Sequence, residues 1–178
     1  MTLPSNRNIA PTLLRPAPPI DTGIDSGTIR VSSPVGCLEV EATTDIIIAV
    51  RWIEGGADDA VDGHGLLAEA RRQLKAYFAG QIKVFDLPLA PAGSPFERDV
   101  WRQMCDIPYG DIMTYGEMAQ AVGGVARAVG GACGANPIPV IIPCHRVLGA
   151  GNRMVGYSGR GHVETKRWLL VHEGALLV

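Results

Sequence analysis

The chain has 178 residues, of which 47% are hydrophobic and 19% charged, a globular balance that excludes extended disorder, collagen and coiled coil for its bulk. The longest uncharged stretch, residues 128–144, is broken by Gly and Pro too often to span a bilayer, and the first 20 residues lack the apolar run of a secretion signal, so we expect a cytoplasmic protein. The net charge is −2, but the first 100 residues hold nine basic and 13 acidic side chains and the remaining 78 hold seven and five, which places any polyanion-binding surface in the second half.

The N-terminal half predicts a small α/β unit. Residues 1–27 contain five prolines and no apolar periodicity, which predicts a flexible leader. Apolar residues at helical spacing between His64 and Ala79, with a stop at Gly80, predict one amphipathic helix that covers a sheet face. Three β-rich runs separated by turn residues predict the antiparallel sheet, and a fourth run predicts a further strand. These runs are residues 28–33, 37–43, 46–53 and 83–89.

A short Ala-Pro-Ala-Gly linker at residues 90–93 divides the chain. We therefore expect a leader at 1–27, an N-terminal α/β domain at 28–91 and a C-terminal domain at 92–178.

The C-terminal half is predicted to be mostly helical. Ser94 and Thr114 each open a helix with a capping box, because a Glu follows three residues after each of them. The second of these helices is short, stops at a glycine pair and is followed by another short helix, which is the outline of a helix-turn-helix. Residues 138–142 predict a buried strand, and residues 163–172 predict a final helix that ends at Gly174.

Cys144 is the best nucleophile candidate among four cysteines that are too far apart in sequence to indicate a disulfide framework or a zinc site. It precedes His145 and Arg146, and a neighbouring cation or base lowers the pKa of a thiol. The alternative is an inert buried cysteine, which is the commoner fate of a free thiol. Adjacent strand residues point in opposite directions, so His145 needs a turn to reach the thiol, and Pro143 is compatible with one.

Three other residues carry two interpretations each. Glu173 could orient an imidazole, although its spacing alone favours a solvated helix end. Asn136, before a proline, is first a turn signal and second a polar group that pins a loop beside the nucleophile. Arg127 is the one long charged side chain on a helix of small residues, which is typical either of a cationic probe toward a partner or of a lone surface arginine.

The chain from Ser94 onward resembles the catalytic domain of the O6-alkylguanine-DNA alkyltransferases, the methylated-DNA protein-cysteine methyltransferases. Five blocks occur in the family's order: IPYGDIMTYGEMA, ARAVGGA, NPIPVIIPCHRV, GYSG and KRWLLVHEGA. The PCHRV block holds the family's acceptor cysteine. The resemblance implies an α+β protein with a ribonuclease H-like N-terminal domain and a mostly helical C-terminal domain that contains a winged helix-turn-helix.

The resemblance also implies site residues. Cys144 matches the cysteine that attacks the alkyl carbon on guanine O6, His145 the base that acts through water, and Glu173 the carboxylate behind it. Tyr115 matches the tyrosine that donates toward guanine N3 and helps to rotate the nucleotide out of the duplex, and Asn136 the residue that braces the site. The remaining matches are Arg127 as the finger that fills the vacated stack, Ala126 and Ala128 beside it on the DNA-binding helix, and Val147, Tyr157, Ser158 and Cys133 in the substrate pocket.

The implied function is DNA repair in which O6-alkylguanine, and O4-alkylthymine as a second lesion, is flipped out of double-stranded DNA and its alkyl group moves irreversibly to Cys144. One transfer would spend the protein, without a metal or other cofactor, and a monomer is the simplest expectation. Two alternatives are a relative that binds the lesion without transfer, and a cysteine hydrolase, which would need an oxyanion hole that the sequence does not indicate.

Overall fold

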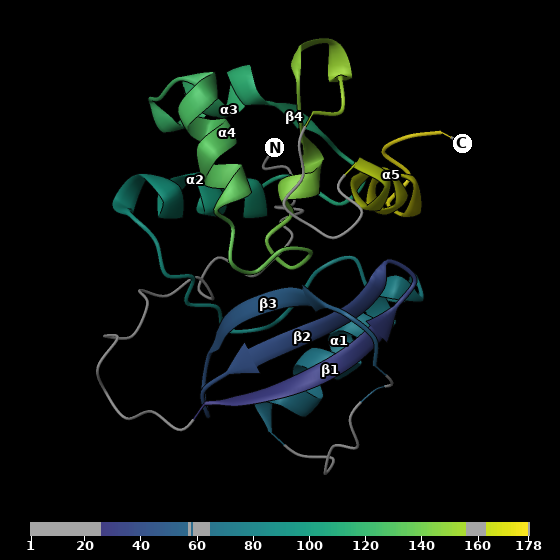
Figure 1. Ribbon diagram of the computed structural model, residues 1–178. Coiled ribbons are helices and arrows are strands. Elements are labelled where there is room, and N and C mark those ends of the chain that lie inside the picture. The colour runs from purple at the N-terminus through teal and green to yellow at the C-terminus, as the bar shows by residue number, and fades with distance from the viewer. Residues whose placement is uncertain (1–25, 57, 59–64, 156–162, 178) are drawn as a thin grey trace, which may run out of the picture.

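The computed structural model describes residues 26–56, 58, 65–155 and 163–177. The predicted leader, apart from its last two residues, lies outside this part. The described elements form a sheet domain with one helix, followed by a helical domain (Figure 1), so the predicted α+β class is confirmed. None of the described helices has the length and apolar character needed to cross a membrane.

The sheet domain is built on three antiparallel strands in the order β1-β2-β3, as the sequence predicts. The strands are β1 (Gly27–Ser33), β2 (Gly36–Ala42) and β3 (Ile47–Ile53). Alternation buries Val31, paired with Leu38, and Val40, paired with Val50, on the face that α1 covers.

Helix α1 (Leu66–Phe78) packs its apolar stripe against this sheet, with Leu74 and Tyr77 fully buried. It ends where predicted, because Gly80 adopts a φ of 70°, a conformation that favours glycine.

The predicted strand at residues 83–89 is wrong, although its alternate apolar residues are buried. The Gln73 side chain donates to the carbonyl of Asp86 at 2.9 Å and accepts from its amide at 2.7 Å. These two bonds occupy the backbone groups that a ladder would need. Leu89 pairs with the sheet through an isolated bridge to Ile47.

The helical domain confirms the predicted helices and both capping boxes, at Ser94 and Thr114. Two very short strands, β4 and β5, pair in parallel beside α3. The elements are α2 (Pro95–Cys105), β4 (Met113–Thr114), α3 (Tyr115–Val122), α4 (Ala126–Gly134), β5 (Val147–Leu148) and α5 (Val163–His172).

The predicted strand at residues 138–142 is also wrong, because this segment folds back on itself. The amide of Ile142 donates to the carbonyl of Ile138 at 2.9 Å, and Val140 between them has a φ of 73°. Pro139 within the segment, and Pro137 and Pro143 on either side of it, lack the amides that a strand would use. The loop packs against the sheet domain, where the amide of Val50 donates to the carbonyl of Pro137 at 2.9 Å.

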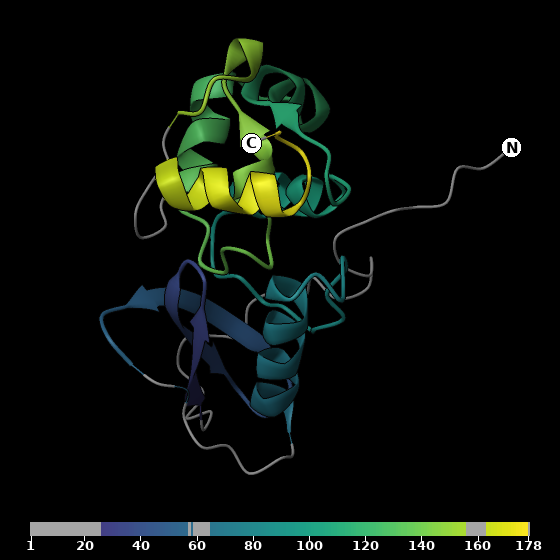
Figure 2. The same ribbon diagram turned by 90° about the vertical axis from the view of Figure 1, so that its right-hand side faces the viewer.

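Helix α5 closes the helical domain on the side that faces the sheet domain, above the end of α1 (Figure 2). Its C-terminal end therefore lies where the two domains meet.

Candidate active site

Cys144 lies at the first position of a 3-10 helix, η1 (Cys144–Arg146), which follows Pro143. The predicted turn is therefore confirmed, and it places His145 and Cys144 on one tight bend rather than on opposite faces of a strand. The thiol residue is 3% exposed.

Asn136 braces the loop that leads to this turn. Its amide nitrogen donates to the carbonyl of Ile142 at 2.9 Å, and its carbonyl oxygen accepts from the amide of Ile138 at 3.0 Å. The left-handed backbone of Val140 inside this loop costs about 1–3 kcal/mol, which the surrounding bonds must offset. Of the two interpretations of Asn136, the geometry favours the brace.

The groups that affect the pKa of the Cys144 thiol differ from the neighbouring His145 and Arg146 side chains that the sequence indicates. Burial raises the pKa of the thiol, against our expectation of a lowered value. A hydrogen bond from Asn136, the charge of Lys166, and the amides of Cys144 and His145 oppose that rise. The guanidinium of Arg146 does not serve the thiol, because it is bonded elsewhere.

The guanidinium of Arg146 is bonded instead to Glu173, which follows directly after α5. Arg146 donates to both carboxylate oxygens of Glu173, at 2.7 and 2.8 Å, and to the carbonyl of Ile107 at 2.6 Å. Tyr77 donates its hydroxyl to Oε1 of Glu173 at 2.7 Å. The side chains of Glu173 and Arg146 are fully buried, so the interpretation of Glu173 as a solvated helix end is wrong. These partners hold the pKa of Glu173 well below its usual range despite burial.

His145 bonds the same carboxylate, with its Nε2 2.9 Å from Oε1 of Glu173. An acceptor at Nε2 selects the tautomer that carries its proton there, which leaves the lone pair on Nδ1. Nδ1 is the one buried side-chain nitrogen or oxygen without a partner in the described part of the chain. Burial lowers the pKa of His145, although Glu173 opposes this. The ring is thus neutral, oriented and able to accept a proton at Nδ1.

Lys166 is a buried cation that our sequence reasoning missed. It is 1% exposed, donates to the carbonyl of Val147 at 2.7 Å, and lies 5.9 Å from the ring centroid of Tyr115. Burial lowers the pKa of Lys166, and charge on Cys144 or Cys133 raises it. A signal was present, because Lys166 and Glu173 share one helical face with Leu169 and Leu170 at spacings of three, four and seven residues.

The predicted pocket residues gather around Cys144 as far as they are described. Tyr115 begins α3 and is half-buried, and burial together with charge on Cys133 or Cys144 raises the pKa of its hydroxyl. Cys133 is buried on α4, and Val147 follows η1. Tyr157 and Ser158 lie outside the described residues.

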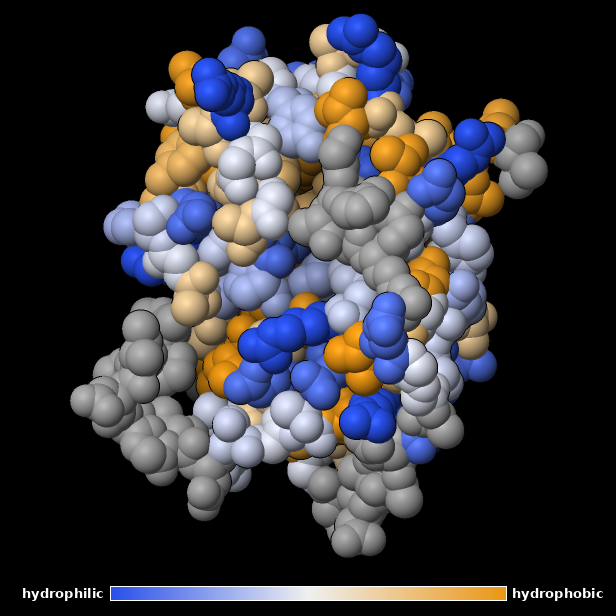
Figure 3. Space-filling model, in the orientation of Figure 1, coloured by the Kyte–Doolittle hydropathy of each residue, from blue (hydrophilic) through white to orange (hydrophobic). Residues whose placement is uncertain are grey.

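The predicted DNA-binding helix presents small side chains to solvent. Ala126, Arg127 and Ala128 are all exposed in the first turn of α4, and the preceding Val125 is 66% exposed. Gly123, with a φ of 68°, makes the turn from α3. The surface over α3 and α4 accordingly mixes pale apolar areas with isolated hydrophilic side chains (Figure 3).

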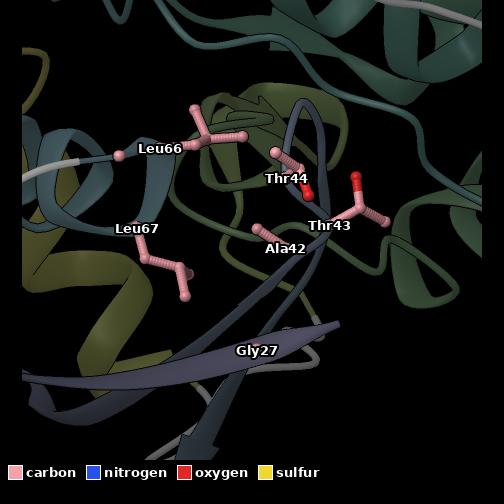
Figure 4. Close-up of a pocket in the computed structure, with 7 residues that line it drawn as sticks. Gly27, Ala42, Thr43, Thr44, Leu66 and Leu67 are labelled. Carbon is pink, nitrogen blue, oxygen red and sulfur yellow. The ribbon is translucent and has the colours of Figure 1, made fainter. Parts of the chain in front are cut away.

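A cavity of about 270 Å³ in the sheet domain is separate from these residues (Figure 4). Its described lining consists of Gly27, Ala42, Thr43, Thr44, Gly65, Leu66 and Leu67, and none of these residues has a titratable side chain.

Two family models together match most of the chain. The ribonuclease-like domain of 6-O-methylguanine DNA methyltransferase matches residues 28–91, and the DNA-binding domain of 6-O-methylguanine DNA methyltransferase matches residues 95–175.

Curated relatives and solved structures agree with these models. A methylated-DNA–protein-cysteine methyltransferase of Methanosarcina acetivorans is 40% identical over 150 residues, which are 80% of this chain and 95% of the relative. One from Shigella flexneri is 50% identical over 109 residues, or 60% and 63% of the two chains. The crystal structure of the Mycobacterium tuberculosis O6-methylguanine methyltransferase superposes with a TM-score of 0.75 at 35% identity, over 86% of this chain and 96% of that one. A structure of Mycobacterium tuberculosis OGT in complex with DNA gives 0.72 at 38% identity, over 82% and 91%.

Proposed function

Because this chain belongs to the family of methylated-DNA–protein-cysteine methyltransferases, we propose that it repairs double-stranded DNA by moving one alkyl group from guanine O6 to the thiol of Cys144. The observation that carries the proposal is the buried turn in which Cys144 adjoins His145, whose ring is fixed by Glu173 at 2.9 Å.

The reaction balances without a cofactor. His145 takes the thiol proton at Nδ1, through a water molecule, and the sulfur then displaces the alkyl carbon from O6 in line. The carbon–sulfur bond forms as the carbon–oxygen bond breaks, and the guanine leaves as an anion that takes up a proton. The product thioether is not hydrolysed, so each molecule acts once.

Two residues near the thiol can stabilise the negative charge that develops on the sulfur and on the guanine ring in this step. The cation of Lys166 stabilises the thiolate before attack. Tyr115 stays protonated because burial raises its pKa, so its hydroxyl can donate toward guanine N3 as negative charge reaches the ring. The carbonyl of Val147, which accepts from Lys166 at 2.7 Å, has a second lone pair for the exocyclic amine of guanine.

The lesion has to leave the base stack to reach a thiol that is 3% exposed. Flipping costs a few kcal/mol, and a damaged base pair lowers that cost. The small exposed residues at the start of α4 suit close approach to the minor groove, with Arg127 entering the stack in place of the flipped nucleotide. The related OGT in complex with DNA supports DNA as the partner. O4-alkylthymine is the second substrate that we propose for the same pocket.

The test is a mass measurement on the intact protein and its peptides after incubation with a duplex that carries O6-methylguanine. We expect one methyl group per molecule, on the peptide that holds Cys144. The Cys144→Ala variant should bind the same duplex and gain no mass, and Cys37→Ala, which removes a free thiol in the sheet domain, should react like wild type. Binding by the wild type without any mass change would instead indicate a relative that recognises the lesion and transfers nothing.

A further inference from the structure

We propose that Tyr77, on α1 of the sheet domain, is a positioning residue for the transfer reaction: its hydroxyl fixes the Glu173 carboxylate and thereby His145, so the N-terminal domain completes the active centre. This inference rests on the proposed function for its consequence in catalysis. Its geometry stands independently of that function.

Tyr77 reaches the centre from 96 residues away in the sequence. Its hydroxyl donates to Oε1 of Glu173 at 2.7 Å, and its own carbonyl oxygen lies 2.8 Å from Nε2 of His172. The residue is fully buried. Two bonds to consecutive residues therefore tie one turn of α1 to the end of α5.

Aromatic side chains hold the Tyr77 ring in place. Phe85 lies 5.1 Å from it between ring centroids, His172 lies at 5.3 Å and Tyr109 at 6.2 Å. Edge and tilted contacts of this kind fix a ring in one orientation. The hydroxyl is thus aimed at the carboxylate by packing that involves both domains.

The hydroxyl and the imidazole share one oxygen. Oε1 of Glu173 accepts from Tyr77, from His145 and from Arg146, whereas Oε2 accepts mainly from Arg146. Burial and the nearby carboxylate raise the pKa of Tyr77 well above its usual value, so the hydroxyl always donates. Each donor draws negative charge away from the oxygen that faces His145 and makes the carboxylate a weaker partner for an imidazolium.

The charged and titratable groups around His145 are few among the described residues: Glu173, Arg146 and Lys166 act directly, and Tyr77 acts through its hydrogen bond to the carboxylate. Tyr109 lies near the carboxylate but donates to the carbonyl of His172 instead. Removing the Tyr77 hydroxyl changes only one of them. It leaves Oε1 more basic, so His145 holds a proton more strongly and spends more time as an imidazolium, which cannot act as a base. The loss of activity should accordingly be larger at low pH.

The experiment uses the full chain in three forms: wild type, Tyr77→Phe and Tyr109→Phe. Tyr109 is a matched control, because it belongs to the same aromatic cluster but donates to the carbonyl of His172, at 3.1 Å, and not to the carboxylate. Single-turnover methyl transfer from the O6-methylguanine duplex is followed from pH 5.5 to pH 9. The titration of His145 is followed by NMR in the same proteins.

We expect Tyr77→Phe to slow transfer at pH 6 by about two- to tenfold, the range set by the net free energy of one hydrogen bond, and much less at pH 8.5. The His145 titration should move to higher pH, and Tyr109→Phe should leave both readouts at wild-type values. A 3-fluorotyrosine at position 77 is a stronger donor than tyrosine and should move both readouts in the opposite direction. Equal slowing at all pH values, or an equal effect of Tyr109→Phe, would overturn the inference in favour of a purely structural hydroxyl.

The measurements distinguish an error in the proposed function from an error in the role of Tyr77. A wild-type protein that transfers no methyl group contradicts the proposed function, yet the His145 titration in Tyr77→Phe still tests the hydrogen bond. A wild-type protein that transfers normally, with an unshifted His145 titration in Tyr77→Phe, contradicts the role of Tyr77 alone.

Discussion

The substitution Glu173→Gln tests how strongly the buried charge cluster behind His145 is coupled to folding. The side chains of Glu173 and Arg146 are fully buried and joined by bonds of 2.7 and 2.8 Å. The amide keeps the size of the carboxylate but leaves the guanidinium without a counter-charge. Breaking a buried pair on one side costs about 3–5 kcal/mol. That is a large part of the roughly 5–15 kcal/mol that stabilises a typical protein.

Urea unfolding, followed by tryptophan fluorescence and circular dichroism, measures this loss. With an m-value of about 2 kcal/mol/M, the midpoint should fall by roughly 1.5–2.5 M. Adding Arg146→Met should restore part of the stability, because a buried pair replaced on both sides by neutral groups is close to neutral. Asp99→Asn is the control, since it breaks an ion pair with Arg102 whose side chains are more than half exposed and should cost about 1 kcal/mol or less.

Two outcomes would refute the reasoning. One is a Glu173→Gln protein that loses no more stability than Asp99→Asn does. The other is a double variant whose loss equals the sum of the two single losses, because coupled residues deviate from additivity.

Three further predictions concern DNA, the thiol and pH. Arg127→Ala should slow repair of duplex DNA about tenfold, or ~1.4 kcal/mol, and barely change the reaction with a free O6-alkylguanine base, whereas equal losses in single-turnover assays would argue against a role in the stack. Lys166→Met should raise the pKa of Cys144 and slow its alkylation by iodoacetamide at pH 7, because the opposing cation is lost, and an unchanged rate–pH profile would contradict this. Folding stability, measured by thermal unfolding, should fall from pH 7 to pH 4. The pKa of His145 is lowered from 6.5 and that of Glu173 from 4.5 on folding, so the unfolded chain binds more protons and the stabilisation is lost as the pH falls below those values. Glu173→Gln should make the dependence of stability on pH weaker.

Most helices and strands of the fold could be predicted from local sequence patterns. The capping boxes at Ser94 and Thr114 depend on residues three positions apart, and the final helix depends on its own periodicity, so these elements could be predicted. Both false strands failed for reasons that their apolar pattern does not show. Asp86, in the middle of residues 83–89, gives both of its backbone groups to Gln73, and residues 138–142, which include Pro139, fold around Asn136.

The site was predictable only at its nucleophile and along the adjacent turn. Glu173 looked solvated because its partners lie 27 to 96 residues away. Its place on the face of Leu169 and Leu170 indicates burial, but it does not identify Arg146 and Tyr77 as partners. The buried helix face that Lys166 shares with Leu169 could be predicted from the spacing. A lysine on such a face is, however, easily interpreted as lying at its solvent-exposed boundary.

Because Cys144 is buried, its reactivity depends on the residues around it. A thiol with a raised pKa stays protonated and inert toward oxidants and stray electrophiles, which would preserve it for the single transfer that we propose. Attack then requires a base that is neutral at physiological pH and cannot turn away, and the carboxylate behind His145 supplies that orientation. The groups that act on the thiol and on its base therefore come from α1, α5 and the loop at Asn136, as well as from the PCHRV motif itself.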